Sequence, residues 1–225
     1  MKKAPIMVLV VDDHPIVRRG LSAEINLDPD MQVVGEAHNG VEAVSMARSL
    51  MPDVILMDLV MPEMDGIEAT KAIIAENPNA NILVLTSFTE EENIYSAIKA
   101  GASGFIFKDR RPDELLRAIT DIESGVPMLS PGMTRRLMRE VREQTHPAPT
   151  DEVPLTAREN EILLRVAQGA LYKEIAHEIG VRETTVRAHV SSILGKLNLS
   201  NRSQLVLYAV NHKLIEPNEP NETFH

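Results

Sequence analysis

The chain has 225 residues, of which 33 are acidic and 23 are basic, giving a formal net charge of −10. A hydrophobic fraction of 44% and a charged fraction of 25% are typical of folded globular proteins and exclude wholesale disorder. The sequence contains no cysteine, which excludes disulfide scaffolds and thiolate chemistry and fits a reducing compartment such as the cytoplasm. No apolar run approaches the roughly 18 residues that a spanning helix needs, so we expect no membrane segment.

The first 125 residues alternate between short β-branched runs and stretches with helical periodicity. Strands are predicted at Ile6–Val11, Gln32–Val34, Val54–Met57, Ile82–Leu85 and Gly104–Phe107. Five strands that alternate with helices predict right-handed crossovers and a buried parallel sheet. We therefore expect residues 1–125 to form a doubly wound, flavodoxin-like α/β domain with five parallel strands, five helices and the strand order 2-1-3-4-5.

Residues 126–153 have the composition of a linker. Ser130–Glu143 is basic and has the pattern of a short helix, whereas Gln144–Pro154 contains Pro147, Pro149 and Pro154. Proline removes a backbone donor and disfavours helix before it, so the second half of this stretch is predicted to be extended. At the other end of the chain, the polar residues 216–225 are predicted to form a flexible tail.

Residues 154–215 have an all-helical pattern, and we predict a four-helix domain there. The expected helices are Glu159–Gln168, Tyr172–Ile179, Glu183–Leu197 and Arg202–Lys213. Thr156 and Glu159 have the spacing of a capping box at the start of the first helix. A short turn containing Gly180 joins the second and third helices, which is the signature of a helix-turn-helix unit.

Polar side chains follow four strands of the predicted sheet, where each strand ends. Asp12 and Asp13 follow the first strand, Asp58 the third, Thr86 the fourth and Lys108 the fifth. In the expected strand order these ends lie side by side, and ligands of open parallel sheets bind at this edge. A single Asp after a strand is more often a helix N-cap, so the indication of a site comes from the set as a whole.

Three carboxylates gathered at one edge repel each other and favour a divalent cation. Oxygen-only ligands suit Mg²⁺ or Mn²⁺, with water completing the coordination. Such a cation neutralises phosphoryl oxygens, and a carboxylate can accept the phosphoryl group as an aspartyl-phosphate. In this arrangement Lys108 would pair with a phosphoryl oxygen and Thr86 would donate a hydrogen bond to it.

Four motifs together resemble the receiver domain of two-component response regulators. They are Val8–Asp13, Asp58–Gly66, Leu85–Ser87 and Gly101–Lys108. The resemblance implies that Asp58 is the phosphoacceptor, that Asp12, Asp13, Asp58 and the Val60 carbonyl hold Mg²⁺, and that Thr86 and Phe105 form a switch pair. Two positions depart from the common pattern: the switch aromatic is Phe105, which has no hydroxyl, and Asp109 replaces a frequent proline.

The third helix of the C-terminal domain presents residues suited to base recognition. Its expected outward face contains Thr184, Thr185, Arg187, Ala188 and Ser191. In helix-turn-helix proteins this part of the second motif helix enters the major groove, where arginine binds guanine and alanine contacts the thymine methyl group. The alternative is a helical interaction module in which these side chains are only solvated.

Four further stretches resemble the C-terminal DNA-binding domain of LuxR-type regulators. They are Leu155–Leu163, Lys173–Ala176, Thr185–Val190 and Ile193–Leu197. The resemblance implies base contacts from Arg187, Ala188 and Ser191. It implies phosphate contacts from Lys173, Thr184, Thr185, His189, Lys196 and Arg202. Tyr172 stands where this family commonly has a small polar residue, and Ala188 and Ser191 are weak specificity determinants. The target sequence therefore cannot be read from these residues.

A receiver followed by this domain resembles the NarL/FixJ response regulators, and Asp58–Thr70 and Leu85–Thr89 resemble the LiaR/VraR group of cell-envelope-stress regulators. The resemblance implies a sensor histidine kinase and double-stranded promoter DNA as partners, with homodimerisation on activation. Part of the apolar face of the fourth helix is a candidate for dimerisation; the alternative is that the whole face belongs to the domain's own core. That face contains Leu205, Val206, Tyr208, Ala209 and Val210.

Two other classes of function remain open. The first is a phosphohydrolase that uses an aspartyl-phosphate and Mg²⁺. Such enzymes generally need a general-acid Asp two residues after the nucleophile, and Val60 stands there, so we expect no enzyme beyond slow self-dephosphorylation. The second is an interaction switch whose helical domain binds no DNA.

The charge of the chain is unevenly distributed. Residues 1–125 carry 11 basic and 21 acidic side chains, whereas residues 154–215 carry 8 basic and 5 acidic ones. An acidic protein would not ordinarily be expected to bind nucleic acid. The acidity, however, belongs to the first domain, and the helical domain is basic enough for DNA.

Overall fold

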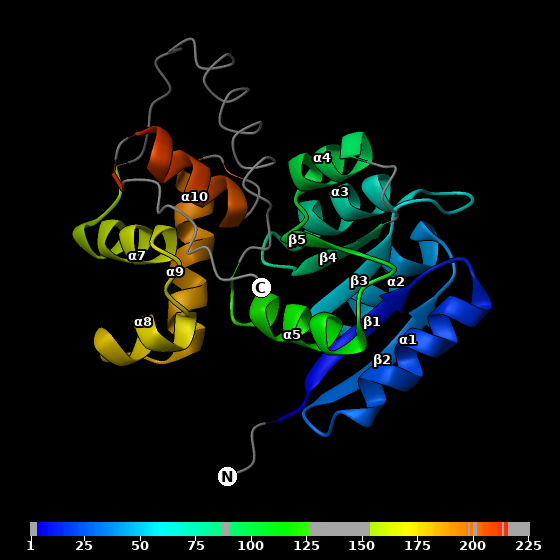
Figure 1. Cartoon of the computed structure of the whole chain (residues 1–225). Helices are drawn as coiled ribbons and strands as arrows, with labels where there is room; N and C mark the ends of the chain where they lie inside the picture. Colours follow the sequence, from blue (N-terminus) through cyan, green and yellow to red (C-terminus); the bar gives the residue numbers. More distant parts are fainter. Residues whose placement is uncertain are drawn as a thin grey trace. The chain divides into compact units, whose positions relative to one another are not determined.

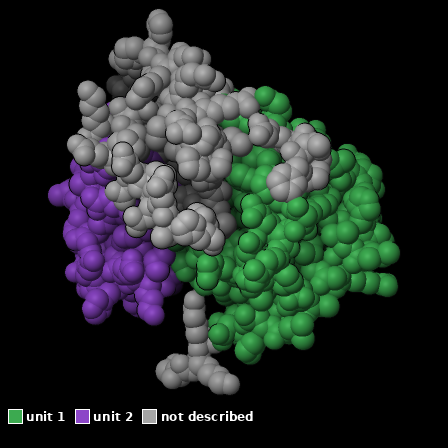
Figure 2. Space-filling view, viewed as in Figure 1, with its two compact units in different colours: residues 1–128 green, residues 129–225 purple. Residues whose placement is uncertain are grey.

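The computed structural model (Figure 1) describes residues 4–86, 91–126, 154–197, 199, 202–212 and 214–215. These residues belong to two compact units, residues 1–128 and 129–225, which Figure 2 shows in different colours. The predicted helix within Ser130–Glu143 and the predicted tail lie outside the described residues. No helix in the described ranges is both long enough and apolar enough to cross a membrane.

Unit 1 is built on a five-stranded parallel sheet with the order β2-β1-β3-β4-β5 (Figure 1). The strands are β1 (Ile6–Val11), β2 (Met31–Ala37), β3 (Val54–Asp58), β4 (Ile82–Thr86) and β5 (Gly104–Phe107). The predicted flavodoxin-like topology is therefore confirmed. β2 is longer than predicted because Gly35 and Glu36, which interrupt its apolar pattern, continue the pairing with β1.

Helices cover both faces of the sheet (Figure 1). They are α1 (Pro15–Leu27), α2 (Gly40–Leu50), α3 (Gly66–Glu76), α4 (Glu91–Ala100) and α5 (Pro112–Glu123). Alternate residues of β1 divide between two cores: Val8 and Val10 pack with residues of α1 and α5, and Leu9 and Val11 with residues of α2 and α3. β3 and β4 are buried at every position, as expected for strands covered on both faces.

Unit 2 contains four predicted helices, whose ends lie within one or two residues of expectation. They are α7 (Ala157–Ala167), α8 (Tyr172–Glu178), α9 (Glu183–Lys196) and α10 (Arg202–Asn211). The capping box is present, because the Glu159 N–H donates to the Thr156 hydroxyl and the Glu159 carboxylate accepts from the Thr156 N–H. Gly180, with φ of +70°, makes the turn between α8 and α9 in a conformation that favours glycine.

The core of unit 2 fixes which side of α9 faces outward. Val186, Val190 and Ile193 are buried against the other helices, so the opposite side of α9 is left toward solvent. On α10, Leu205 and Ala209 are completely buried. This part of the predicted dimerisation face therefore serves the interior of the unit itself.

Candidate functional site

Charged side chains from three strand ends meet at the carboxyl edge of the sheet. Lys108, which follows β5, donates from Nζ to Asp12 Oδ2 at 2.9 Å and to Asp58 Oδ2 at 2.7 Å. The side chains of Asp12 and Asp58 are 0% and 5% exposed, and that of Lys108 is 29% exposed. One lysine ammonium therefore holds two buried carboxylates that lie far apart in the sequence.

The loop after β1 holds Asp12 from both its side chain and its backbone. The His14 N–H donates to Asp12 Oδ1 at 2.8 Å. The guanidinium of Arg18 donates to the Asp12 carbonyl at 2.6 Å and pairs with Glu36 at 3.3 Å. Arg18 was not predicted as a site residue, although its place on the first turn of α1 beside the acidic loop was a usable signal.

Burial and charge oppose each other at Asp58. Burial raises the pKa of Asp58 above its ordinary value, and the hydrogen bonds from Lys108 and the Val60 N–H only partly offset this. Burial alone would lower the pKa of Lys108, but its hydrogen bonds to Asp58 and Asp12 outweigh that effect and raise it. The carboxylates thus have less compensating positive charge than they need, and a further cation would stabilise them.

The acidic residues fit a divalent cation. Ligand atoms of Asp12, Asp13, His14 and Asp58 all lie within 4.8 Å of one another. Asp13 Oδ1 is shielded from solvent and receives no hydrogen bond of good geometry from the described residues, although His14 Nδ1 lies 2.6 Å away. The carboxylate oxygens of Asp12, Asp13 and Asp58 in this cluster could therefore bind a divalent metal ion that prefers oxygen ligands.

The two residues of the predicted switch pair lie on neighbouring strands. Thr86 is completely buried at the end of β4, and its carbonyl accepts from the Lys108 N–H at 2.8 Å. In the sheet register Thr86 is opposite Phe107, whereas Phe105 is opposite Val84. Phe105 is half-buried, and its ring lies edge to face with that of Phe107 at 5.5 Å.

The loop after Asp58 has little freedom. A Cβ atom added to Gly66 would lie 2.0 Å from the Asp58 carbonyl oxygen, so only glycine fits there. Glu63 has a φ of +66°, and its carboxylate accepts from the amide of buried Asn39 at 3.1 Å. Val60 has an exposed side chain on this loop. These contacts hold the chain segment that carries the Val60 carbonyl. The Asn39–Glu63 hydrogen bond was not predicted from the sequence.

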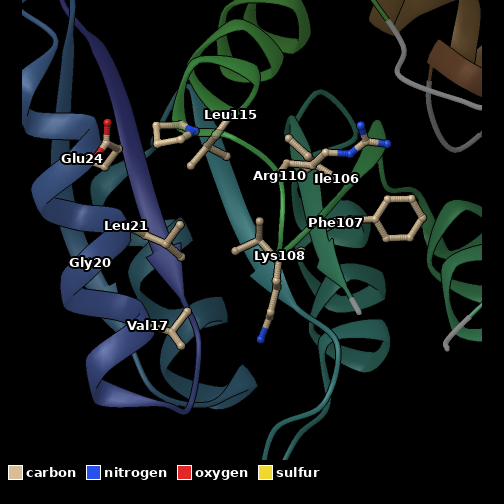
Figure 3. A pocket seen from close by; sticks show the side chains of 11 residues that line it. Val17, Gly20, Leu21, Glu24, Ile106, Phe107, Lys108, Arg110 and Leu115 are labelled. Atoms are coloured by element: carbon tan, nitrogen blue, oxygen red, sulfur yellow. The ribbon is translucent and has the colours of Figure 1, made fainter. Parts of the chain in front are cut away.

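A cavity of about 210 Å³ lies next to Lys108, between α1 and α5 (Figure 3). Val17, Leu21, Ile106 and Leu115 line it with aliphatic carbon. The charged side chains of Glu24, Lys108 and Arg110 also belong to its lining.

The predicted DNA-contacting residues of unit 2 differ in exposure. Lys173, Thr184 and Ala188 are exposed, and Thr185, Arg187, His189, Ser191, Lys196 and Arg202 are half-buried. Thr184 and Ala188, one turn apart, lie on the side of α9 opposite its buried residues. This arrangement leaves the N-terminal half of α9 accessible, as a recognition helix requires.

Three of the basic side chains already bind groups within unit 2. Arg187 donates to Glu183 at 2.8 Å, and Arg202 donates to the Ala170 carbonyl at 3.0 Å. Lys196 donates to Glu159 at 2.7 Å. The spacing of Glu183 and Arg187 on one helix was a usable signal for the first pair. The Lys196–Glu159 bond joins α9 to α7, and the Arg202–Ala170 bond joins α10 to the loop after α7. Neither was visible in the sequence.

Glu159 is a buried polar centre that links α7 to α9. Its carboxylate accepts from the Lys196 ammonium, the Thr156 N–H and the Ser192 hydroxyl, and these bonds lower its pKa to about 2. The capping box predicted only the bonds within α7. The contacts to Ser192 and Lys196 show that the same carboxylate also fixes the end of α9.

Comparison with known proteins identifies the same two units. Residues 8–120 match the response regulator receiver domain, and residues 153–209 match the luxR family of bacterial regulatory proteins. The transcriptional regulatory protein LiaR of Bacillus subtilis is 42% identical over 210 residues, which cover 93% of this chain and 99% of LiaR. The response regulator VraR of Staphylococcus aureus is 40% identical over 211 residues, which cover 94% and 99%. The predicted resemblance to the LiaR/VraR group is therefore confirmed.

A solved structure gives a likeness that extends over both units. The response regulator ChrA of a heme-sensing two-component system is 33% identical, with a TM-score of 0.51, covering 95% of this chain and 100% of ChrA.

Proposed function

The chain belongs to the response regulators that join a receiver domain to a LuxR-type DNA-binding domain, and on this premise we propose that phosphorylation of Asp58 controls its binding to promoter DNA. The phosphoryl group would come from a sensor histidine kinase. The phosphorylated form would dimerise and regulate transcription in the cytoplasm, where kinase and DNA are both available. The observation that carries the proposal is the contact of Lys108 with both Asp12 and Asp58 at 2.9 and 2.7 Å.

In the proposed reaction a carboxylate oxygen of Asp58 attacks the phosphorus, and the bond from phosphorus to the kinase histidine breaks. Lys108 lies within hydrogen-bond distance of Asp58 and would transfer its hydrogen bond to a phosphoryl oxygen. Asp12, Asp13, Asp58 and the Val60 carbonyl would hold Mg²⁺, or Mn²⁺, which supplies positive charge to the phosphoryl oxygens. The raised pKa of Asp58 supports this requirement for added positive charge.

Phosphorylation adds nearly two negative charges beside buried groups. Thr86 would turn its hydroxyl toward the phosphoryl group, and Phe105, which is half-buried on the neighbouring strand, would follow into the vacated space. Because Phe105 lacks a hydroxyl, it would transmit the change by packing alone. The phosphorylated state would thus favour an active conformation already present at low population.

For the DNA-binding unit we propose base contacts from Arg187, Ala188 and Ser191. Phosphate contacts are proposed for Lys173, Thr184, Thr185 and His189. Lys196 and Arg202, also implied by the family resemblance, would have to exchange the Glu159 and Ala170 partners that they hold in unit 2. A dimer with two such helices would suit half-sites about one DNA turn apart.

The site gives little support to enzymatic turnover. Position 60 is a valine with an exposed side chain, so the described site offers no general acid two residues after Asp58. Self-dephosphorylation would therefore be slow.

We also propose the domain boundaries of the chain. The receiver domain is residues 1–125, the linker 126–153, the DNA-binding domain 154–215 and the tail 216–225.

The proposal is tested by measuring DNA affinity and oligomer mass with and without a small acyl phosphate as phosphoryl donor. Wild type should gain one phosphoryl group, dimerise and bind genomic fragments more tightly, with an affinity that falls as salt rises. Asp58→Ala should show none of these responses. Asp109→Ala, an exposed aspartate after β5, is the matched control and should respond like wild type. Phosphorylation-dependent binding that survives Asp58→Ala would refute the proposed mechanism.

A further inference from the structure

We propose that Tyr172 and Glu183 are positioning residues that hold the guanidinium of Arg187 in place, and that they thereby set how well the protein distinguishes its target sequence from other DNA. The inference rests on the proposed function, because it assumes that Arg187 reads a base. It goes further by assigning a role to two residues that need not touch DNA themselves.

Contacts with Glu183 and Tyr172 restrain the guanidinium group of Arg187. Its Nη2 and Nε donate to the same oxygen of Glu183, at 2.8 and 3.3 Å. Its Cζ atom also lies over the ring of Tyr172, 5.2 Å from the ring centre. A charged partner and an aromatic face thus restrain a side chain that would otherwise sample many rotamers.

Tyr172 is itself held rigidly. Its side chain belongs to the core of unit 2, and the residue is only 7% exposed. The guanidinium of Arg202 lies over the same ring, 4.5 Å from its centre. Arg202 is anchored in turn by its hydrogen bond to the Ala170 carbonyl at 3.0 Å. The ring is therefore a fixed surface, built at a position where related domains commonly carry a small polar residue.

This arrangement should strengthen binding to target DNA and weaken binding to other DNA. An arginine that is already ordered loses less conformational entropy when it meets a guanine, so the pre-positioned side chain favours the target. The carboxylate of Glu183 beside it repels the phosphate backbone. On unrelated DNA no hydrogen bond from Arg187 to a base offsets this repulsion. Removing that carboxylate should weaken binding to the target and strengthen binding to unrelated DNA.

The test uses the phosphorylated full chain and a duplex selected by the wild type from a random pool. Dissociation constants are measured at one salt concentration for the selected duplex and for a scrambled duplex of equal composition. The discrimination ratio is the dissociation constant for the scrambled duplex divided by that for the selected duplex. This ratio should fall about tenfold in Glu183→Gln. The control is Glu161→Gln, which removes the same charge from a carboxylate on α7 that pairs with Arg158 and, at the same i,i+4 spacing, with Arg165. It should change both constants alike.

Two further variants separate positioning from a general structural role. In an Arg187→Ala background, Glu183→Gln should leave the discrimination ratio unchanged, because it acts through Arg187. Tyr172→Phe keeps the ring and should retain the wild-type ratio, whereas Tyr172→Leu should lower it. Thermal melting reports whether Tyr172→Leu remains folded. If it does not, the comparison of Glu183→Gln in the wild-type and Arg187→Ala backgrounds tests the positioning role.

The possible failures are distinct. If the phosphorylated wild type selects no duplex, the proposed function and this inference both fall. If it selects a duplex but Glu183→Gln keeps the wild-type discrimination ratio, only the positioning role is overturned. A fall in the ratio that persists undiminished in the Arg187→Ala background would overturn it as well.

Discussion

Unit 1 and unit 2 both depend on charged side chains, but they hold them in different ways. In unit 1, Asp12, Asp58 and Lys108 converge from three strand ends, and the backbone of the sheet sets their positions. In unit 2, Arg187 and Lys196 lie on one helix and are held by other side chains. A substitution in the first site should therefore disturb the fold and the chemistry together, whereas a substitution at Arg187 should mainly change side-chain orientation.

The largest loss of stability should come from a side chain added at Gly66, beside the Asp58 carbonyl. Gly66→Ala places a Cβ atom 2.0 Å from the Asp58 carbonyl oxygen, so the backbone must move, and we expect a destabilisation of about 3 kcal/mol. Gly20→Ala is the matched control, because nothing lies within 4 Å of its added Cβ in α1 and alanine favours helix by about 0.5–1 kcal/mol. Urea unfolding followed by circular dichroism measures both. Equal stability of the two variants would show that the loop after Asp58 yields easily.

A smaller effect is expected when the shared cation of unit 1 is removed. Lys108→Gln leaves the carboxylates of Asp12 and Asp58 without their ammonium partner, and we expect a loss of about 2 kcal/mol in metal-free buffer, discounted for the partial exposure of the lysine. Mg²⁺ should then raise the melting temperature of the variant more than that of wild type, because it replaces the missing charge. An identical response to Mg²⁺ would place the cation away from these carboxylates.

In unit 2, Arg202 tests whether a basic side chain that is bound inside the unit also contacts DNA. Its Nε and Nη1 atoms are shielded from solvent and have no hydrogen-bond partner among the described residues, and its Nη2 binds the Ala170 carbonyl. We expect Arg202→Gln to cost about 1–2 kcal/mol of stability and to leave the salt dependence of DNA binding unchanged. A phosphate contact would instead reduce the slope of log affinity against log salt by about one. Lys173→Gln, at an exposed position, should show that reduction.

The same difference between the units explains how much the sequence could predict. Asp12, Asp58 and Lys108 were placed together correctly, because parallel strands with a known order bring their ends to one edge. The partners of Lys196 and Arg202 were not foreseen, because helix packing joins residues with no fixed spacing along the chain. Glu63 was also missed: its left-handed backbone and its bond to Asn39 depend on how two loops meet.

The smallest effect concerns the buried carboxylate of unit 2, whose contribution to stability should depend on pH only in the acidic range. The pKa of Glu159 falls from its ordinary value of 4.5 to about 2 in the folded chain, through Lys196, the Thr156 N–H and Ser192. A lowered pKa stabilises the fold above pH 4.5, and this stabilisation is lost as the pH falls toward 2. Because other carboxylates titrate in the same range, the measurement is the difference between wild type and Glu159→Gln in the pH dependence of the unfolding midpoint. The variant should lie below wild type at neutral pH and converge with it in acid. A constant difference between the two would mean that Glu159 contributes by packing, and that its charge does not link α7 to α9.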